Sequence, residues 1–189
     1  MIEDNRVVEL ERKVRELTVF HEIGKALTST LDLSRVLETI MEQISTLFHP
    51  DTWSLLLLEP ESNELHFEIA VGEAAEKLKQ VRLKLGEGVA GWVAQRGEPV
   101  FLPDANTDTR FTTRVDQITR IETRTIAAVP IRGRDGTLGV IELINTPQAL
   151  KFGEEEMFLL QALADYVAIA IENARHVQRI HELTITDDC

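Results

Sequence analysis

The stretch that decides the fold runs from residue 86 to residue 100 and reads Gly86-Glu87-Gly88-Val89-Ala90-Gly91-Trp92-Val93-Ala94-Gln95-Arg96-Gly97-Glu98-Pro99-Val100. Its first six residues match GxGxxG, the pattern that joins a strand to a helix in dinucleotide-binding domains. Residues 81–85 before it alternate between apolar and charged, whereas the first strand of such a domain is buried on both faces and continuously apolar. The helix after it has only about two turns before Gly97. We therefore interpret the glycines as a tight strand-to-helix turn with close packing.

Apolar periodicity predicts the elements on either side of this turn. Alternating or continuously apolar stretches predict strands, and apolar residues spaced three and four apart predict helices. The expected strands are 52–58, 64–71, 81–85, 99–102, 125–131 and 138–145, and the expected helices are 6–30, 32–48, 73–78, 89–96 and 153–183. The segment 103–121 is polar and irregular, with one or two helical turns near 113–120. Strands in hairpins with helices beside them predict an α+β fold with a mostly antiparallel sheet.

The composition excludes several classes of function. Asp and Glu outnumber Lys and Arg by 32 to 20, and the formal net charge is −12, so the surface repels the phosphates of nucleic acids and anionic membranes. The 189-residue chain has one cysteine, Cys189, so no disulfide can form within it, which fits a reducing compartment. No apolar run approaches the ~20 residues that a membrane-spanning helix needs. We expect a cytoplasmic protein that binds neither nucleic acid nor membrane.

Several motifs, taken in order, resemble those of GAF domains. They are Ile23-Gly24-Lys25-Ala26-Leu27, Leu31-Asp32-Leu33, the stretch 86–100 followed by Asp104, Val129-Pro130-Ile131, Gly139-Val140-Ile141-Glu142-Leu143-Ile144-Asn145, and Phe152-Gly153-Glu154-Glu155-Glu156. The resemblance covers residues 17–175. It implies an α+β fold of the GAF type: a six-stranded antiparallel sheet with helices on one face, long N- and C-terminal helices, and a ligand pocket beneath loops on the other face.

The GAF-type architecture places the pocket between the sheet and the segment 101–121, which is long and polar, as lids are. Strand residues would form its walls, namely Trp53, Leu55, Leu57 and Phe67. The mouth would be formed by Phe101, Asp104, Thr107, Arg110, Phe111 and Thr125. Asp104 and Arg110 could pair with each other or with the ligand. The alternative is that the strand aromatics pack in the core and that Asp104 holds a turn.

The resemblance leaves the ligand open. GAF domains that bind cyclic nucleotides often carry an Asn-Lys, a Phe and an Asp-Glu pair. This chain has Asn145-Thr146, Phe152 and Glu155-Glu156, so the lysine and the aspartate are missing, and a cyclic nucleotide is one candidate among others. Bilin attachment in related domains uses a pocket cysteine that this chain lacks, and His49 and His66 are expected at the surface. Neither bilin nor haem is therefore expected.

No catalytic function is expected of the chain itself. Some GAF-like proteins reduce free methionine sulfoxide with pocket cysteines, but Cys189 alone supplies no resolving partner. No spacing typical of metal ligands and no Ser-His-Asp arrangement stands out. Two interpretations follow: a sensor of an unidentified small molecule, or a GAF fold retained only for dimerisation, whose pocket is filled by its own side chains.

Both terminal helices carry apolar residues at the spacing of helices that pair with a partner. We expect a homodimer in which residues 1–16 form a dimerisation helix, residues 17–175 the GAF domain, and residues 176–189 a helical linker. The expected dimer contacts are Val7, Leu10, Val14 and Leu17 at one end of the chain and Ala174, Val177 and His181 at the other.

The final residues, Leu183-Thr184-Ile185-Thr186-Asp187-Asp188-Cys189, resemble the entry to a GGDEF domain, which typically reads Leu-Thr-x-x-Asp. The resemblance implies a C-terminal output domain that makes cyclic di-GMP from two GTP molecules, one on each protomer. A histidine kinase or an ATPase-type transcription activator is the alternative output. The sequence thus predicts the sensory domain of a bacterial-type signal transduction protein, which as a whole would be a diguanylate cyclase.

Overall fold

A computed structural model describes the backbone of residues 2–29, 32–147 and 152–186, and the side chains of residues 6–27, 32–147 and 152–177. The chain divides into two compact units. One, here the sheet unit, is Ile44–Ala168. The other, here the helical unit, is formed by Met1–Gln43 and Ile169–Cys189.

The sheet unit contains one antiparallel sheet of six strands. The strands are β1 (Thr52–Glu59), β2 (Glu64–Val71), β3 (Arg82–Lys84), β4 (Val100–Leu102), β5 (Ile126–Gly133) and β6 (Gly136–Ile144). Their order in the sheet is β3-β2-β1-β6-β5-β4, and every neighbouring pair is antiparallel. This confirms the predicted α+β fold with a six-stranded antiparallel sheet.

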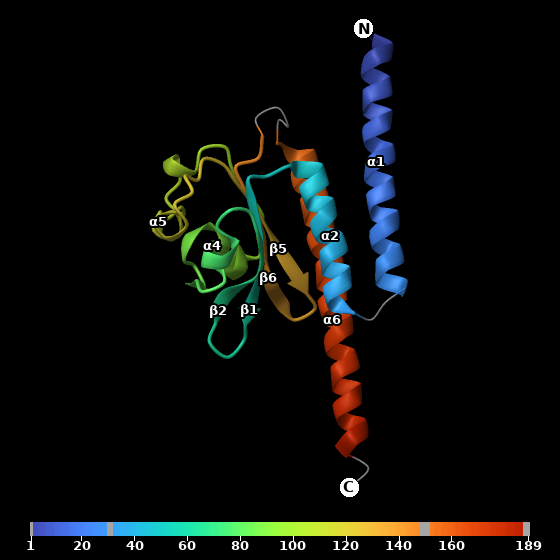
Figure 1. Ribbon diagram of the computed structural model, residues 1–189, viewed down its shortest axis with the longest axis vertical. Helices are drawn as coiled ribbons and strands as arrows, with labels where there is room; N and C mark the ends of the chain where they lie inside the picture. The colour runs from blue at the N-terminus through green and yellow to red at the C-terminus, as the bar shows by residue number, and fades with distance from the viewer. Residues whose placement is uncertain (1, 30–31, 148–151, 187–189) are drawn as a thin grey trace. The chain divides into compact units, whose positions relative to one another are not determined.

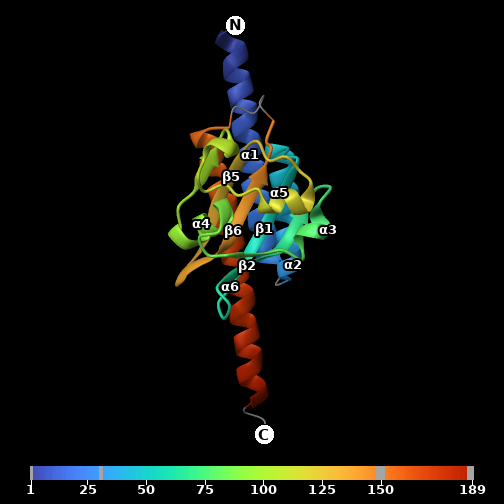
Figure 2. The same cartoon turned by 90° about the vertical axis from the view of Figure 1, so that its left-hand side faces the viewer.

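Helices cover both faces of this sheet (Figure 1). The first half of the long helix α6 (Glu154–Thr186) lies on one face, where Leu160, Leu163 and Val167 have no exposed surface. The Gln161 side-chain amide there donates to the Pro130 carbonyl of β5 at 2.9 Å. The other face carries the short helices α3 (Ala75–Leu78), α4 (Gly88–Arg96) and α5 (Arg114–Thr119), which stand in front of the sheet in Figure 2, and the 3-10 turn η1 (Ala105–Thr107).

The glycine stretch forms the tight turn from β3 into α4. The Gly86 amide donates to the Gly91 carbonyl at 2.9 Å, and Gly86 has a φ of 82°. A Cβ atom at Gly91 would come within 2.5 Å of the Lys84 carbonyl oxygen, a distance that a side chain cannot adopt. The pattern GxGxxG therefore serves close packing of α4 against the strand end, as the sequence predicts.

The helical unit contains α1 (Ile2–Ser29), most of α2 (Leu33–Phe48) and the second half of α6. In α1, Val19 and Ile23 are buried, but the apolar residues of the predicted dimer contact are not. Their exposed fractions are 53% for Val7, 59% for Leu10, 61% for Val14 and 68% for Leu17. In α6, Ala174 is half-buried, Val177 is 42% exposed, and the side chain of His181 lies outside the described residues.

One described helix, Glu154–Val177 within α6, is long and apolar enough to cross a membrane by length and composition alone. Of its most apolar part, 44% is buried inside the protein. Its apolar residues Leu160, Leu163 and Val167 belong to the core on the sheet. Packing within the protein therefore accounts for part of its apolar composition.

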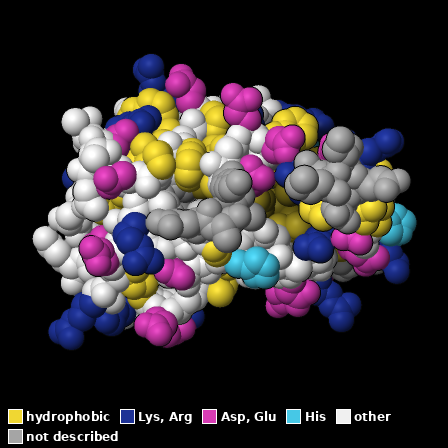
Figure 3. Space-filling model, turned by 90° about the horizontal axis from the view of Figure 1, so that it is seen from above, with side chains coloured by type: hydrophobic (Ala, Val, Ile, Leu, Met, Phe, Trp, Pro, Cys, Tyr) yellow, Lys and Arg dark blue, Asp and Glu magenta, His cyan; other side chains and the backbone are white. Residues whose placement is uncertain are grey.

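Charged side chains of both signs are interspersed on the face shown in Figure 3, and neither sign forms a continuous patch there. On α1, ion pairs join Arg12 to Glu16 and Lys13 to Glu9, each at 3.3 Å and one helical turn apart. Such exposed pairs contribute a few tenths of a kcal/mol each to a helix. Acidic and basic side chains are therefore mixed on this face.

A candidate small-molecule cavity

A cavity lies in the sheet unit, between the sheet and the segment that carries α5. It offers about 60 Å³ of space to water-sized molecules. Strands β1, β2, β3, β5 and β6 supply the floor, α3 and the start of α4 the sides, and residues 111–123 the lid. The lining residues are Thr52, Ser54, Phe67, Leu78, Leu83, Gly88, Val89, Ala90, Phe111, Thr112, Val115, Asp116, Thr119, Ile121, Thr123, Ile126, Glu142 and Ile144.

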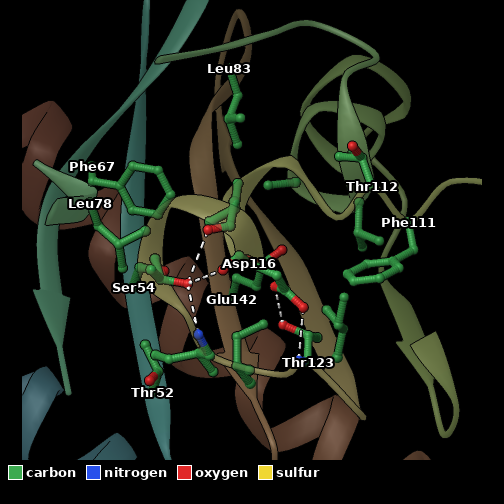
Figure 4. A pocket seen from close by; sticks show the side chains of 18 residues that line it. Thr52, Ser54, Phe67, Leu78, Leu83, Phe111, Thr112, Asp116, Thr123 and Glu142 are labelled. Carbon is green, nitrogen blue, oxygen red and sulfur yellow. Dashed lines mark hydrogen bonds between the residues drawn. The ribbon is translucent and has the colours of Figure 1, made fainter. Parts of the chain in front are cut away.

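The polar part of the floor comes from two adjacent strands. Ser54 on β1 is the direct cross-strand partner of Glu142 on β6, so both side chains point to the same face of the sheet. Ser54 is only 2% exposed, and within the described residues neither its hydroxyl nor the Glu142 carboxyl has a hydrogen-bond partner. The charge of Asp116 acts on the Glu142 carboxyl, and Figure 4 shows Phe67, Leu83 and Phe111 among the side chains that line the same cavity.

The cavity changes the acidity of Glu142. Burial, and to a smaller extent the neighbouring charge of Asp116, raises the pKa of this carboxyl to about 7. Both effects act in the same direction because each disfavours the ionised form. Near neutral pH the floor of the cavity therefore holds a carboxyl group that is divided between its neutral and ionised forms.

The lid is held to the rest of the sheet unit by polar contacts. Asp116 accepts hydrogen bonds from the Thr123 hydroxyl at 2.7 Å and the Thr123 amide at 2.9 Å. Arg114 pairs with Glu87 at the glycine turn, and Lys77 of α3 donates to the Thr119 carbonyl at 3.4 Å. Glu87 also accepts from the Lys84 amide, and these two contacts lower the pKa of its carboxyl despite partial burial. The lid is thus fastened at several points around the cavity.

Of the ten residues predicted for the pocket, Phe67 and Phe111 line this cavity. Trp53 and Leu55 are buried on the opposite face of β1, where the Trp53 indole N–H donates to the Ser45 hydroxyl of α2 at 3.1 Å. Leu57 also lies outside the lining. The physical reason is strand alternation: the even-numbered residues Thr52 and Ser54 face the cavity, so the odd-numbered residues face away.

The remaining predicted residues also lie outside the lining. Phe101 stacks on Phe152, with 5.0 Å between ring centres, and Asp104 caps η1 by accepting from the Asn106 amide at 3.1 Å. The Thr107 hydroxyl donates to the Asp104 carbonyl, and the Thr125 hydroxyl accepts from the Thr146 amide. Each of these groups is used in a local turn or packing contact.

Arg110 pairs with Asp108 and not with Asp104, the partner that the sequence suggested. Two hydrogen bonds of 2.8 and 2.7 Å join the guanidinium to the carboxylate, and they lower the pKa of Asp108 to about 2. The guanidinium also lies over the Trp92 ring, 4.7 Å from its centre. Arg110 therefore fixes the start of the lid on α4.

Sequence reasoning missed Ser54, Asp116 and Glu142. One signal was available: Glu142 interrupts the apolar run from Gly139 to Ile144, and Ser54 interrupts that of β1. A polar residue in a strand that is buried on both faces needs a partner, and a cavity ligand is one way to supply it. No comparable signal was available for Asp116, which lies in an irregular polar segment.

The residues that match the cyclic-nucleotide motif have structural contacts of their own. The Asn145 side chain accepts from the Arg124 amide at 2.7 Å and the Thr125 amide at 3.3 Å, and donates to the Glu122 carbonyl at 2.9 Å. Phe152 packs between Phe48 and Phe101. No group of three or more metal-ligating side chains occurs in the part of the chain that the structure describes.

A mostly apolar cavity with a few converging polar groups is typical of domains that bind small molecules. The chain belongs to the GAF domain family, whose sequence model matches residues 32–171. GAF domains are sensory and regulatory modules of signalling proteins, and the order of strands and the lid described above agree with this assignment.

Two known proteins with similar sequences are much longer than this chain. The chain is 27% identical over 178 residues to the dual 3',5'-cyclic-AMP and -GMP phosphodiesterase 11 of Drosophila melanogaster. This alignment covers 87% of this chain and 12% of the phosphodiesterase. It is 30% identical over 170 residues to the phosphodiesterase 11A of Takifugu rubripes, covering 85% of this chain and 19% of that protein. The chain thus spans less than a fifth of the length of these relatives.

Solved structures agree on the fold. The GAF domain of a phosphoenolpyruvate-protein phosphotransferase from Acinetobacter superposes with a TM-score of 0.71 and 25% identity, over 87% of this chain and 97% of that one. The corresponding domain from Coxiella burnetii gives a TM-score of 0.75 at 22% identity, over 88% and 98% of the two chains.

Proposed function

We propose that this chain is the sensory domain of a bacterial-type signalling protein and that it binds a small molecule in the cavity above Ser54 and Glu142. The observation that carries the proposal is that Ser54 and Glu142 face a mostly apolar cavity from adjacent strands, with no hydrogen-bond partner for either side chain within the described residues. Polar groups that face a cavity can bind a ligand there, whereas a cavity filled with apolar side chains would leave them without a hydrogen bond at a cost in free energy. The chain itself has a regulatory and not a catalytic role.

Signal transmission would begin at the lid. A ligand that touches Asp116 and Phe111 changes how residues 111–123 lie on the sheet. The sheet packs on α6 through Leu160, Leu163 and Val167, so a shift in that packing alters the helix that leads to the C-terminal end of the chain. Packed cores have discrete arrangements, and a small shift therefore becomes a switch between two of them.

The output domain is proposed to be a diguanylate cyclase of the GGDEF type, fused in a cytoplasmic homodimer. The support is the sequence from Leu183 to Asp187. A histidine kinase or a transcription activator in the same position would use the same helix. Mass spectrometry of the natural full-length protein, followed by an assay for cyclic di-GMP formation from GTP, distinguishes these outputs.

A cyclic nucleotide is the second ligand candidate, and the similarity to cyclic-nucleotide phosphodiesterases favours it. The size of the cavity counts against it: pockets for drug-sized ligands are about 300–1,000 Å³, so the lid would have to open widely. Calorimetric titration with cyclic AMP and cyclic GMP tests this candidate. Heat of binding that disappears in Glu142→Leu would support it, and absence of heat with both nucleotides would exclude it.

Purely structural dimerisation is the second candidate function, supported by the exposed apolar residues of α1. Native mass spectrometry after incubation with a small-molecule extract of the expressing cells separates it from sensing. We expect a bound mass on the wild-type chain and on the control Ala162→Leu, which adds bulk on α6, and none on Ala90→Leu, which fills the cavity. If the wild-type chain binds nothing, or if Ala90→Leu binds equally well, the cavity is not a ligand site.

A further inference from the structure

We infer that the ligand of this cavity carries a compact cation, a primary ammonium or an amidinium group, seated between Glu142 and Asp116 and attached to a small apolar body. The inference rests on the proposed function and specifies its ligand class. It follows from the charges that line the cavity, from the groups that have no hydrogen-bond partner in the described part of the chain, and from the size of the space.

The charges in the lining have one sign. Glu142 and Asp116 are the charged residues among the 18 that line the cavity, and no lysine, arginine or histidine is among them. Lys77, the basic side chain that reaches the lid from α3, donates to the Thr119 carbonyl. A phosphate or carboxylate bound at the floor would therefore face two carboxyl groups with no basic side chain in the lining to offset them.

The two carboxyl groups are not equivalent. Asp116 is anchored by two hydrogen bonds from Thr123, whereas within the described residues none reaches Glu142. A buried carboxylate is stabilised by a cation that also donates hydrogen bonds to it. An ammonium or amidinium has enough donors for Glu142 and for the Ser54 hydroxyl opposite it, and it offsets the repulsion between the two acids.

The remaining walls select the rest of the ligand. Phe67, Leu83 and Phe111 surround the acidic floor in Figure 4, and Val89 and Ile126 complete an apolar enclosure. A space of about 60 Å³ admits only a few heavy atoms without movement of the lid. Aromatic rings next to a cation add a further attraction through their π faces.

A matched series of four-carbon probes tests the inference: n-butylammonium, n-butanol and butyrate. Their affinities are measured by chemical-shift titration of backbone amides at about pH 8, where a carboxyl with a pKa of about 7 is ionised. We expect n-butylammonium to bind about tenfold or more tightly than n-butanol, because a charge-assisted hydrogen bond to a buried carboxylate is added. Butyrate should not bind.

Two variants separate the contribution of the Glu142 carboxylate to binding from that of the apolar cavity. Glu142→Gln should reduce the affinity for n-butylammonium to that for n-butanol, whereas Glu61→Gln, in the exposed turn between β1 and β2, should leave it unchanged. If n-butanol or butyrate binds as tightly as n-butylammonium, the cavity is a ligand site but the inference of a cationic ligand is wrong. If none of the three shifts the amides of lining residues, the proposed small-molecule site itself fails.

Discussion

Ser54 on β1 and Glu142 on β6 are direct cross-strand partners, and both side chains face the cavity. A shift of one residue in either strand would turn one of these side chains to the opposite face of the sheet and bring Trp53, Leu55 or Leu143 to the floor. The register of these two central strands therefore determines whether the cavity has a polar floor at all.

Replacing Glu142 by Gln should abolish part of the pH dependence of stability. The pKa of Glu142 is raised in the fold from 4.5 to about 7, so its stabilising contribution is complete below pH 4.5 and is lost as the pH rises through about 7. The shift corresponds to a change on the order of 3 kcal/mol at most. We expect the stability of wild type relative to Glu142→Gln to fall between these pH values, with a Tm change of about 2–4 °C per kcal/mol. Identical pH profiles by scanning calorimetry, with Glu61→Gln as control, would contradict the assignment.

Removing the contact between Arg114 and Glu87 should loosen the lid without unfolding the domain. Both side chains are partly exposed, so Arg114→Ala should cost no more than about 1 kcal/mol of global stability. Hydrogen exchange of the α5 amides should nevertheless become several-fold faster, because local opening needs fewer broken contacts. Arg96→Ala, at the exposed end of α4, is the control. Equal protection of α5 in both variants would show that this ion pair does not hold the lid.

Replacing Asn145 by Ala should destabilise the sheet unit by about 2–4 kcal/mol, because three hydrogen bonds are lost and a residue with a φ of 55° loses a side chain that tolerates this conformation. Asn145→Asp keeps the acceptor for the Arg124 and Thr125 amides but loses the donor to Glu122, so an intermediate loss is expected. Urea unfolding measures both. A loss below about 1 kcal/mol in Asn145→Ala would mean that these bonds do not anchor the end of the lid.

The apolar seam of α1 is the row formed by Val7, Leu10, Val14 and Leu17. A charge within this seam should weaken the proposed homodimer. Val7, Leu10, Val14 and Leu17 are spaced three and four apart, and each is more than half exposed in the single chain. Val14→Glu should raise the dimer dissociation constant by about tenfold or more, because it places like charges face to face in an apolar contact. Val8→Glu, equally exposed but off the seam, should have little effect. Sedimentation velocity decides, and a monomeric wild type at high micromolar concentration would count against the dimer.

The sequence was sufficient for the fold because its patterns were local. The alternation in 81–85, the glycine turn and the hairpin 125–145 each depend on neighbouring residues, and the structure confirms them. It was insufficient for the orientation of β1, whose residues Thr52 to Leu56 are all buried. When both faces of a strand are covered, hydrophobicity does not indicate which side chains face a cavity, and the aromatic Trp53 was preferred to Ser54.

The lid shows a second limit of sequence reasoning. Its polar composition predicted an irregular segment, but the choice of Asp108 over Asp104 as the partner of Arg110 depends on the path of the backbone around η1. The pairing of Asp116 with Thr123 likewise depends on a turn that no periodic pattern reveals. Asp104 was singled out by its place in a motif, and in the fold it caps that turn.

The raised pKa of Glu142 also makes the cavity a site of proton exchange with the buffer. A carboxyl with a pKa of about 7 is about half ionised at neutral pH. A ligand that binds only when Glu142 is ionised can therefore bind to about half of the protein molecules at any time. Its apparent affinity is then reduced only about twofold, and its arrival displaces about half a proton per binding event. A neutral occupant that prefers the protonated form would instead take up about half a proton. The heat of binding in two buffers with different ionisation enthalpies therefore reports the charge of an occupant before its identity is known.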